Sequence, residues 1–227
     1  MTISGISSMA TRALLAELAA AFERLAGCRV AFESVGGVDA AKRVEAGEPF
    51  DVVVLAADAL DRLQAAGHTV PGTRVDVTRS AVAVAVPAGA PRPDLGSEEA
   101  VRHAVLAAQR VGYSTGPSGT ELLKLFARWG IAGEAAPRLV QARAGVPVAA
   151  LVASGEVDLG FQQYSEMMSA PGLDVVGMLP PPIEIVTTFA AGVCAAAREP
   201  ARARELLAFL ASPETAEAKR RHGMQPA

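Results

Sequence analysis

Small and hydroxylated residues stand at three places where an apolar, strand-like segment meets a helix-like one. They are Ser7-Ser8, Gly36-Gly37 and the run from Ser114 to Gly119, which reads STGPSG. A helix N-terminus carries unpaired N–H groups and a partial positive charge, so it attracts anions. Hydroxyls and glycines at that point add donors and allow close approach. The chemistry that these residues indicate is the binding of a small anion.

Helix capping is the simpler explanation of any one of these junctions, because serine is a common N-cap residue. Three junctions in one α/β chain favour a shared site, since the carboxyl ends of the strands tend to meet at one edge. Arg12, Arg79 and Arg143 lie near the junctions and could clamp a carboxylate bidentately, or could be solvated surface residues. Both interpretations stay open from the residues alone.

A pair of glutamines, Gln162-Gln163, directly follows an apolar segment that ends at Phe161. Paired amides are unusual for a simple turn, and they can donate uncharged hydrogen bonds to a ligand. A structural role fits the same position equally well, so both interpretations are kept.

The composition excludes several other classes of function. Among 227 residues there are 21 Lys and Arg against 24 Asp and Glu, and aromatic residues make up 4%, which argues against nucleic-acid binding. Cys28 and Cys194 are far apart, and the histidines are isolated, so no metal-ligand spacing is present. No phosphate-binding, zinc-protease or nucleophile motif occurs. We therefore expect no metal and no cofactor.

The elements that must position these residues alternate between strand-like and helix-like patterns, which predicts an α/β fold with parallel sheets. Strands are expected at 3–6, 29–34, 51–55, 80–86, 110–113 and 157–162, and helices at 9–25, 39–46, 58–66, 98–108, 120–129, 147–153, 200–211 and 213–222. No linker divides the chain, so two lobes would have to be joined by extended segments, for which 80–86 and 183–194 are the best candidates. We expect residues 1–80 with 186–227 to form one lobe and residues 81–185 the other.

The first eight residues have neither the basic region nor the apolar region of a secretory signal. The expectation is a cytoplasmic protein for the chain as given, and a periplasmic one if a leader has been removed. No apolar run is long enough to span a bilayer.

Three segments, following a serine junction, carry a resemblance to a known family. They are KRVEAGEPFDVVVLAAD at 42–58, YSTGPSGT at 113–120 and LVASGEVDLGFQQYSE at 151–166. In this order they resemble the molybdate-binding proteins of ABC importers, which have the type II periplasmic binding-protein fold. The resemblance covers nearly the whole chain. It implies two α/β lobes, joined by crossing strands, that close on an anion in a cleft, with an ABC importer as partner if an upstream leader was trimmed.

The resemblance also assigns ligand-binding positions. Ser8 matches the first ligand serine, the N–H of Ser118 matches the backbone donor after the proline, and Gly145-Val146 supplies a further backbone donor. The second ligand serine falls at Gly37-Val38, where no hydroxyl exists, and the ligand tyrosine falls at Gln163. These departures favour a larger or planar anion, with carboxylates as the natural candidates, over molybdate or tungstate.

Some relatives of this family are similar to aconitate isomerases. Such an enzyme shifts a proton along an allylic tricarboxylate, and it needs clamps on the carboxylates and one positioned acid/base. Candidates for that group are Glu33, Asp39, Tyr113 and Glu166. The main expectation is thus a protein that binds a small carboxylate by lobe closure, with an isomerase as the alternative. A regulatory sensor ranks last, because no DNA-binding segment is attached.

Overall fold

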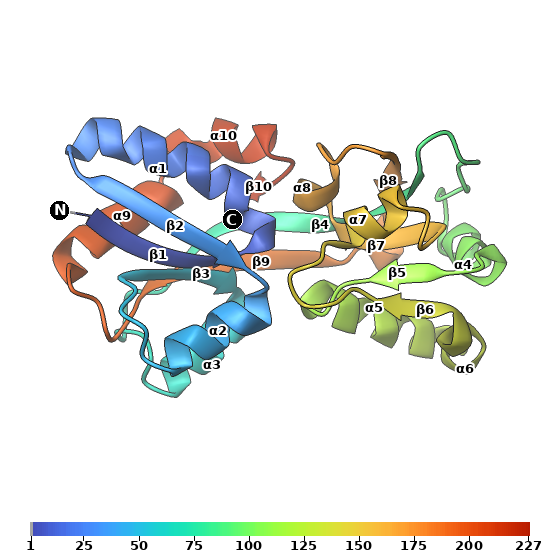
Figure 1. The fold of residues 1–227 in the computed structure, drawn as a ribbon, viewed down its shortest axis with the longest axis horizontal. Coiled ribbons are helices and arrows are strands. Elements are labelled where there is room, and N and C mark those ends of the chain that lie inside the picture. Colours follow the sequence, from blue (N-terminus) through green and yellow to red (C-terminus); the bar gives the residue numbers. More distant parts are fainter. Residues whose placement is uncertain (1) are drawn as a thin grey trace. The chain divides into compact units, whose positions relative to one another are not determined.

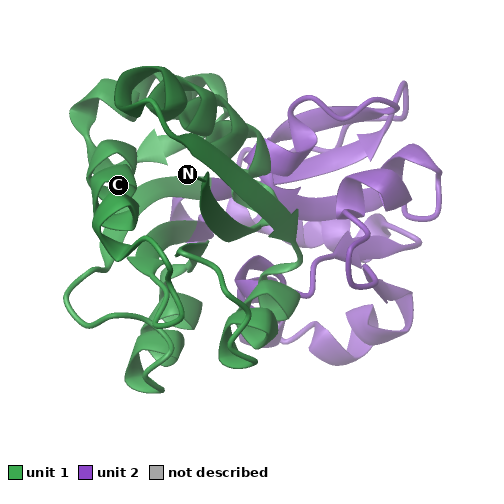
Figure 2. Cartoon of the chain, turned by 60° about the vertical axis from the view of Figure 1, so that its left-hand side comes forward, with its two compact units in different colours: residues 1–80, 187–227 green, residues 81–186 purple. Residues whose placement is uncertain are grey.

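The structure is a computed structural model, and it describes residues 2–227. The chain divides into two compact units (Figure 2). Unit 1 comprises the chain up to Ser80 together with Thr187–Ala227, and unit 2 comprises Ala81–Val186. The chain leaves unit 1 within β4 (Val75–Pro87) and returns to it at the start of β9 (Val186–Val193).

Unit 1 is built on strands in the hydrogen-bonded order β2-β1-β3-β9-β4. Besides β4 and β9, its elements are β1 (Thr2–Ser8), η1 (Met9–Thr11), α1 (Arg12–Ala26), β2 (Arg29–Val35), α2 (Gly37–Glu45), β3 (Val52–Ala56), α3 (Ala57–Ala65), α9 (Pro200–Ala211), η4 (Pro213–Thr215), α10 (Ala216–Arg221) and β10 (Gln225–Pro226). Strand β1 is parallel to β2 and β3, whereas β9 is antiparallel to β3 and β10 is antiparallel to β4.

Both faces of the unit 1 sheet are covered by helices, which explains the continuous apolar run of β3. Val52 and Val54 pack into a core that also contains Leu14 and Leu15 of α1 and residues of α9 and α10. Val53 and Leu55 face a second core with residues of α2 and α3. Figure 1 shows α1 and α10 above these strands and α2 and α3 below them.

Unit 2 has the strand order β4-β7-β5-β6, with β8 also paired to β4. Its elements are the second part of β4, α4 (Glu98–Ala107), β5 (Val111–Tyr113), α5 (Pro117–Arg128), α6 (Ala132–Ala135), η2 (Ala136–Arg138), β6 (Leu139–Gln141), α7 (Val148–Ala153), β7 (Leu159–Gln163), α8 (Tyr164–Met167), β8 (Leu173–Met178) and η3 (Pro181–Ile183). Strand β5 is parallel to β6 and β7, while β4 is antiparallel to β7 and β8.

The alternating segment SAVAVAV of β4 divides its side chains between the two faces of the unit 2 sheet. Val82, Val84 and Val86 pack with residues of α4, α5 and α6. The smaller Ala83 and Ala85 lie in the other core, with residues of α7 and with Met167 of α8. Alternation of this kind places bulky side chains under the larger helical layer.

The predicted α/β class is confirmed, and parallel pairs are present in both units, but the sheets are mixed. The long strands β4 and β9 run antiparallel to their neighbours β7 and β3. Both strands are buried on both faces, and an apolar run of that kind does not reveal the direction of its partner. Among residues 2–227, the structure contains no helix with the length and apolarity that a bilayer crossing requires.

Asp51 ties three segments of unit 1 together. Its Oδ2 accepts hydrogen bonds from the N–H (2.8 Å) and hydroxyl (2.9 Å) of Ser4, and its Oδ1 accepts from the N–H groups of Arg198 (2.7 Å) and Glu199 (2.9 Å). Burial raises the pKa of Asp51, but these donors outweigh it, so the pKa lies below its ordinary value. The carboxylate is a structural group rather than a site residue.

We expect Asp51→Ala to lower the free energy of unfolding by about 3 kcal/mol at neutral pH, because buried donors lose their acceptor. Since the folded-state pKa lies below the unfolded one, this stabilisation is present above the unfolded pKa and is lost as the pH falls through the folded pKa. Urea unfolding at neutral and acidic pH measures both effects. The control is Asp58→Ala, which removes an exposed pair with Arg62 and should cost under about 0.5 kcal/mol. Equal losses of unfolding free energy in Asp51→Ala and Asp58→Ala would contradict the structural role of Asp51.

Candidate functional site

The first group of predicted residues lies at one edge of the unit 1 sheet, where β1, β2 and β3 end. These strands are parallel and in register, and the register pairs Ser7 with Ser34. The hydroxyl oxygens of Ser7 and Ser34 are 2.8 Å apart. The Ser8 hydroxyl accepts a hydrogen bond from the N–H of Ala10 at 3.3 Å and so caps η1. We call Ser7, Ser8, Ser34, Gly36 and Gly37 the serine edge.

Helix α2 begins directly beside Ser8. A Cβ atom added to Gly37 would lie 3.7 Å from the Cβ of Ser8, so the backbone of the first turn passes close to that side chain. The N–H of Ala40 donates to the carbonyl of Gly36 at 2.9 Å, whereas the N–H groups of the earlier positions have no acceptor within the helix. The serine edge therefore combines hydroxyls with a helix N-terminus, a combination suited to an anion.

The second group lies at one edge of the unit 2 sheet, where the parallel strands β5, β6 and β7 end. We call Ser114, Ser118, Gly119, Gln162, Gln163 and Glu166 the amide edge. The hydroxyls of Ser114 and Ser118 are 3.0 Å apart, which closes the loop between β5 and α5. Ser118 is the second residue of α5, where a backbone N–H has no acceptor within the helix.

Gly119 is required by the tight turn into α5. A Cβ atom at this position would lie 2.0 Å from the carbonyl oxygen of Ser114, closer than any real contact. The N–H groups of Gly119 and Thr120 donate to the carbonyl of Gly116 at 3.0 and 3.2 Å. The turn thus fixes the direction of the Ser118 N–H.

Gln162 and Glu166 form a hydrogen-bonded chain at the end of β7. The Oε1 of Gln162 accepts from the N–H of Ala149 at 2.9 Å, and its Nε2 donates to Oε1 of Glu166 at 2.9 Å. Burial raises the pKa of Glu166 to about 7, and the hydrogen bond from Gln162 opposes that rise. Gln163 is the last residue of β7 and is also buried. A carboxyl with this pKa can both accept and release a proton at neutral pH.

The predicted backbone donor at Gly145-Val146 lies in the loop that follows β6. Gly145 has a φ of +77°, and the N–H of Val146 donates to the carbonyl of Arg143 at 3.0 Å. The Val146 N–H is therefore engaged in a turn of its own loop. The loop still belongs to the same sheet edge, because β6 is parallel to β5.

Three other predicted residues lie outside the two edges. Glu33 forms an ion pair with Arg43, which also contacts Glu48 at 2.7 Å, and this pairing holds the pKa of Glu33 below its ordinary value. Arg79 donates to the carbonyl of Pro226 at 3.0 Å, beside β10. Arg12 is exposed at the first position of α1.

The two remaining acid/base candidates lie near the edges without joining their hydrogen-bond networks. Asp39 is part-buried in the first turn of α2, and its Oδ2 is 3.4 Å from the place that a Cβ on Gly36 would occupy. Tyr113 is the last residue of β5 and packs against the core beneath α4 and α5.

Ser34 is the residue of the serine edge that the sequence did not single out. The feature that would have identified Ser34 is the strand register, because Ser34 is the parallel partner of Ser7. The N–H of Ala149 was missed as well, because its acceptor Gln162 is 13 residues away.

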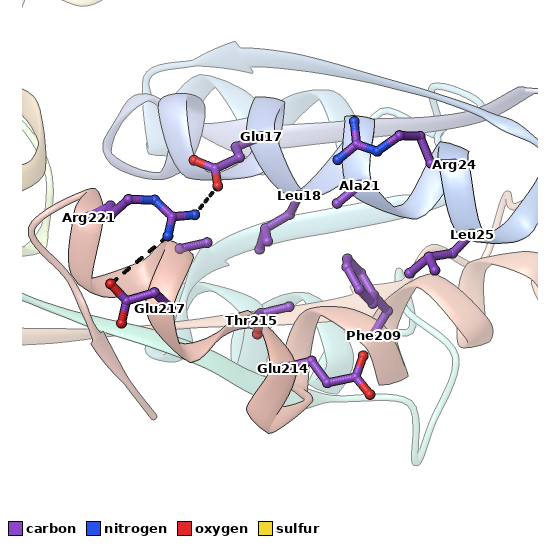
Figure 3. Close-up of a pocket in the computed structure, with 11 residues that line it drawn as sticks. Glu17, Leu18, Ala21, Arg24, Leu25, Phe209, Glu214, Thr215, Glu217 and Arg221 are labelled. Carbon is purple, nitrogen blue, oxygen red and sulfur yellow. Dashed lines mark hydrogen bonds and ion pairs between the residues drawn. The ribbon is translucent and has the colours of Figure 1, made fainter.

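A separate hollow lies on the outer helices of unit 1 (Figure 3). Leu18, Leu25 and Phe209 line it, and an ion pair between Arg221 and Glu17 stands at its rim. It contains no residue of the serine edge. Within residues 2–227, no group of three or more His, Cys, Asp or Glu side chains is arranged to hold a metal ion.

Comparisons with known proteins agree with this architecture. A family model described as bacterial extracellular solute-binding protein matches residues 3–225. The chain is 36% identical over 233 residues to an aconitate isomerase from a Pseudomonas species, covering 99% of this chain and 88% of that protein.

Solved structures show the same fold at low sequence identity. The periplasmic molybdate-binding protein of Azotobacter vinelandii aligns with a TM-score of 0.80 at 20% identity and covers 98% of each chain. The tungstate ABC transporter structure from Geobacter sulfurreducens aligns with a TM-score of 0.72 at 18% identity, covering 96% of this chain and 97% of that one. The expected resemblance and the two-lobe α/β fold class are confirmed.

Proposed function

Since the chain belongs to the family of bacterial extracellular solute-binding proteins, we propose that it binds an aconitate-like tricarboxylate and interconverts its isomers. The sequence alone favoured a binding protein for a small carboxylate and kept the isomerase as the alternative. Two findings favour the isomerase: the identity of 36% to an aconitate isomerase, and the presence of Glu166 at the amide edge.

Glu166 is the observation that carries the proposal. An allylic proton shift needs one group that removes a proton from carbon and returns it to a second carbon. A carboxyl with its pKa at about 7 is populated in both protonation states at neutral pH, so it suits both halves of the reaction. Glu33 and Arg43 neutralise one another instead, which makes Glu33 a poor acid/base.

In the proposed step, the Glu166 carboxylate takes a proton from the methylene carbon of the substrate. The C–H electron pair forms a new double bond to the central carbon, and the electrons of the former double bond move to the former vinyl carbon. That carbon then receives the proton from Glu166. The number of atoms and electrons is unchanged, and no co-reactant is needed.

The negatively charged carboxylates of the substrate need hydrogen-bond donors that the fold holds in fixed positions before the substrate binds. In our proposal each edge supplies donors of its own for carboxylate groups. The serine edge offers the hydroxyl of Ser8 and the first N–H groups of α2, and the amide edge offers the N–H of Ser118 and the amide of Gln163. Fixed N–H and O–H donors also stabilise the charge that spreads onto a carboxylate as the proton leaves. The absence of a hydroxyl at Gly37-Val38 leaves room for a ligand wider than a tetrahedral oxyanion.

Binding without turnover, in the service of an ABC importer, is the second candidate function. The family model and the likeness to the molybdate-binding protein favour it. A thermal-shift panel with molybdate, sulfate, citrate, cis-aconitate and trans-aconitate tests the ligand class, since a ligand stabilises the folded state by mass action. We expect stabilisation by the tricarboxylates. Stabilisation by molybdate alone would overturn the carboxylate proposal.

We expect Ser8→Ala to weaken tricarboxylate binding about tenfold, because one hydrogen bond to a charged group is lost. Isothermal titration calorimetry measures the change in Kd. The control is Ser154→Ala, which removes a hydroxyl that donates to the carbonyl of Leu151 outside both edges. Unchanged affinity in Ser8→Ala, or an equal loss in Ser154→Ala, would remove Ser8 from the site.

A further inference from the structure

We propose that Gln162 is a positioning residue that holds Oε1 of Glu166 as a hydrogen-bond acceptor and leaves Oε2 to exchange the proton. This inference rests on the proposed function, because it concerns how Glu166 would act. It assigns Gln162 to the carboxyl group rather than to the ligand.

The orientation of the Gln162 amide is fixed by its partners. The backbone N–H of Ala149 can only donate, so the amide atom that faces it at 2.9 Å must be the carbonyl oxygen. The other end of the amide is then the NH₂ group, which can only donate to Glu166. Rotation of the amide by 180° would place two donors against each other at Ala149.

This fixed donor distinguishes the two oxygens of Glu166. In the structure Oε1 accepts the N–H of Gln162, and Oε2 does not. The carbonyl oxygen of a protonated carboxyl accepts a hydrogen bond better than its hydroxyl oxygen does, so this donor favours Oε1 as the carbonyl oxygen and Oε2 as the oxygen that carries the proton. Removal and return of a substrate proton therefore take place at one defined oxygen, as a positioned acid/base requires.

Among residues 2–227, on the face of the sheet that α7 covers, no charged side chain of α7, β7 or the unit 2 part of β4 competes with Gln162 for this role. Helix α5 also packs on β7 and carries Glu121, Lys124 and Arg128, but it covers the opposite face. Helix α8 packs on β7 and, through Met167, on the core formed by α7 and the alanines of β4. Within the described residues, β7, α7 and the unit 2 part of β4 carry no ionisable side chain, and Tyr164 is the other titratable group of α8. Burial and the Gln162 amide are the influences on the pKa of Glu166.

Gln162 also caps α7, which has no side-chain cap of its own. The two roles can be separated by Gln162→Glu, because a glutamate keeps an oxygen for the Ala149 N–H but, when ionised, has no proton to donate to Glu166. Two carboxyls in contact share a proton, and this raises the upper pKa of the pair. The control is Ser97→Ala, which removes the cap of α4 in the same unit, where Ser97 accepts from the N–H of Ala100 at 3.1 Å.

The test is a carboxyl ¹³C NMR titration of glutamate-labelled protein, with the signal of Glu166 assigned from the Glu166→Gln variant. In Gln162→Glu we expect the titration of Glu166 to move upward by about one pH unit or more. Gln162→Met, which removes both contacts, should also move it upward, and it serves as the second variant if Gln162→Glu does not fold. Ser97→Ala should leave the titration unchanged.

A titration of Glu166 that stays within about 0.3 pH units of the parent in the folded Gln162 variants would overturn the proposal. The same NMR experiment needs no substrate, so it separates this inference from the proposed function. A shifted titration in a protein without isomerase activity would support the role of Gln162 and reject the enzyme. Where the parent is active, the acid limb of its pH–rate profile should move with the NMR titration.

Discussion

Glu166→Gln is expected to lower the rate of isomer interconversion by about 10²–10⁴-fold, because the group that moves the proton is lost. The amide is nearly isosteric with the carboxyl and retains an oxygen for the Nε2 of Gln162. The Kd for the tricarboxylate should therefore change by less than about threefold. Rates from an isomer assay and affinities from calorimetry distinguish the two effects.

The matched control is Glu156→Gln, which changes an exposed glutamate in the loop before β7. It should have the activity of the parent. The rate of the parent should rise with pH through about 7, as Glu166 becomes the carboxylate that accepts the proton. A Glu166→Gln variant that keeps more than about a tenth of the activity would exclude Glu166 as the acid/base.

Gly119→Ala is expected to disrupt the amide edge. The added Cβ would lie 2.0 Å from the carbonyl oxygen of Ser114, and backbone on both sides must move to relieve the overlap. We expect the free energy of unfolding to fall by about 2 kcal/mol or more. Tricarboxylate affinity should fall at least about tenfold, because the N–H of Ser118 moves with the turn.

Gly133→Ala provides the control for this substitution. Gly133 lies in α6, and a Cβ there meets no atom within 4 Å. Alanine is favoured over glycine in a helix, so the free energy of unfolding should stay the same or rise by up to about 1 kcal/mol. Urea unfolding and calorimetry on both variants provide the comparison. Normal binding by a folded Gly119→Ala protein would show that the turn is not part of the site.

The sequence predicted much of the fold because its longest apolar runs are buried on both faces. The predicted strand at 51–55 overlaps β3 with a shift of one residue, the alternating run at 80–86 lies in β4, and the helix at 200–211 coincides with α9. The strands β6 and β10 were not predicted. They are three and two residues long, too short to show a hydrophobic period, and pairing with β5 and β4 creates them.

The residues of the candidate site that lie at strand ends could be predicted from the sequence. The contacts between residues that are distant in the sequence could not. Ser8 is the last residue of β1 and caps η1, and Ser118 lies in the first turn of α5, so both stand at strand-to-helix junctions that the sequence pattern indicates directly. The ion pair that occupies Glu33 joins residues ten positions apart on different elements. The raised pKa of Glu166 depends on burial, which the sequence around a four-residue helix does not reveal.

Proton NMR of trans-aconitate incubated with the protein tests the central proposal most directly. We expect signals of cis-aconitate to appear, the same final mixture to form from either isomer, and Glu166→Gln to prevent both. Tight binding of both isomers without any interconversion would contradict the isomerase and leave a binding protein for tricarboxylates.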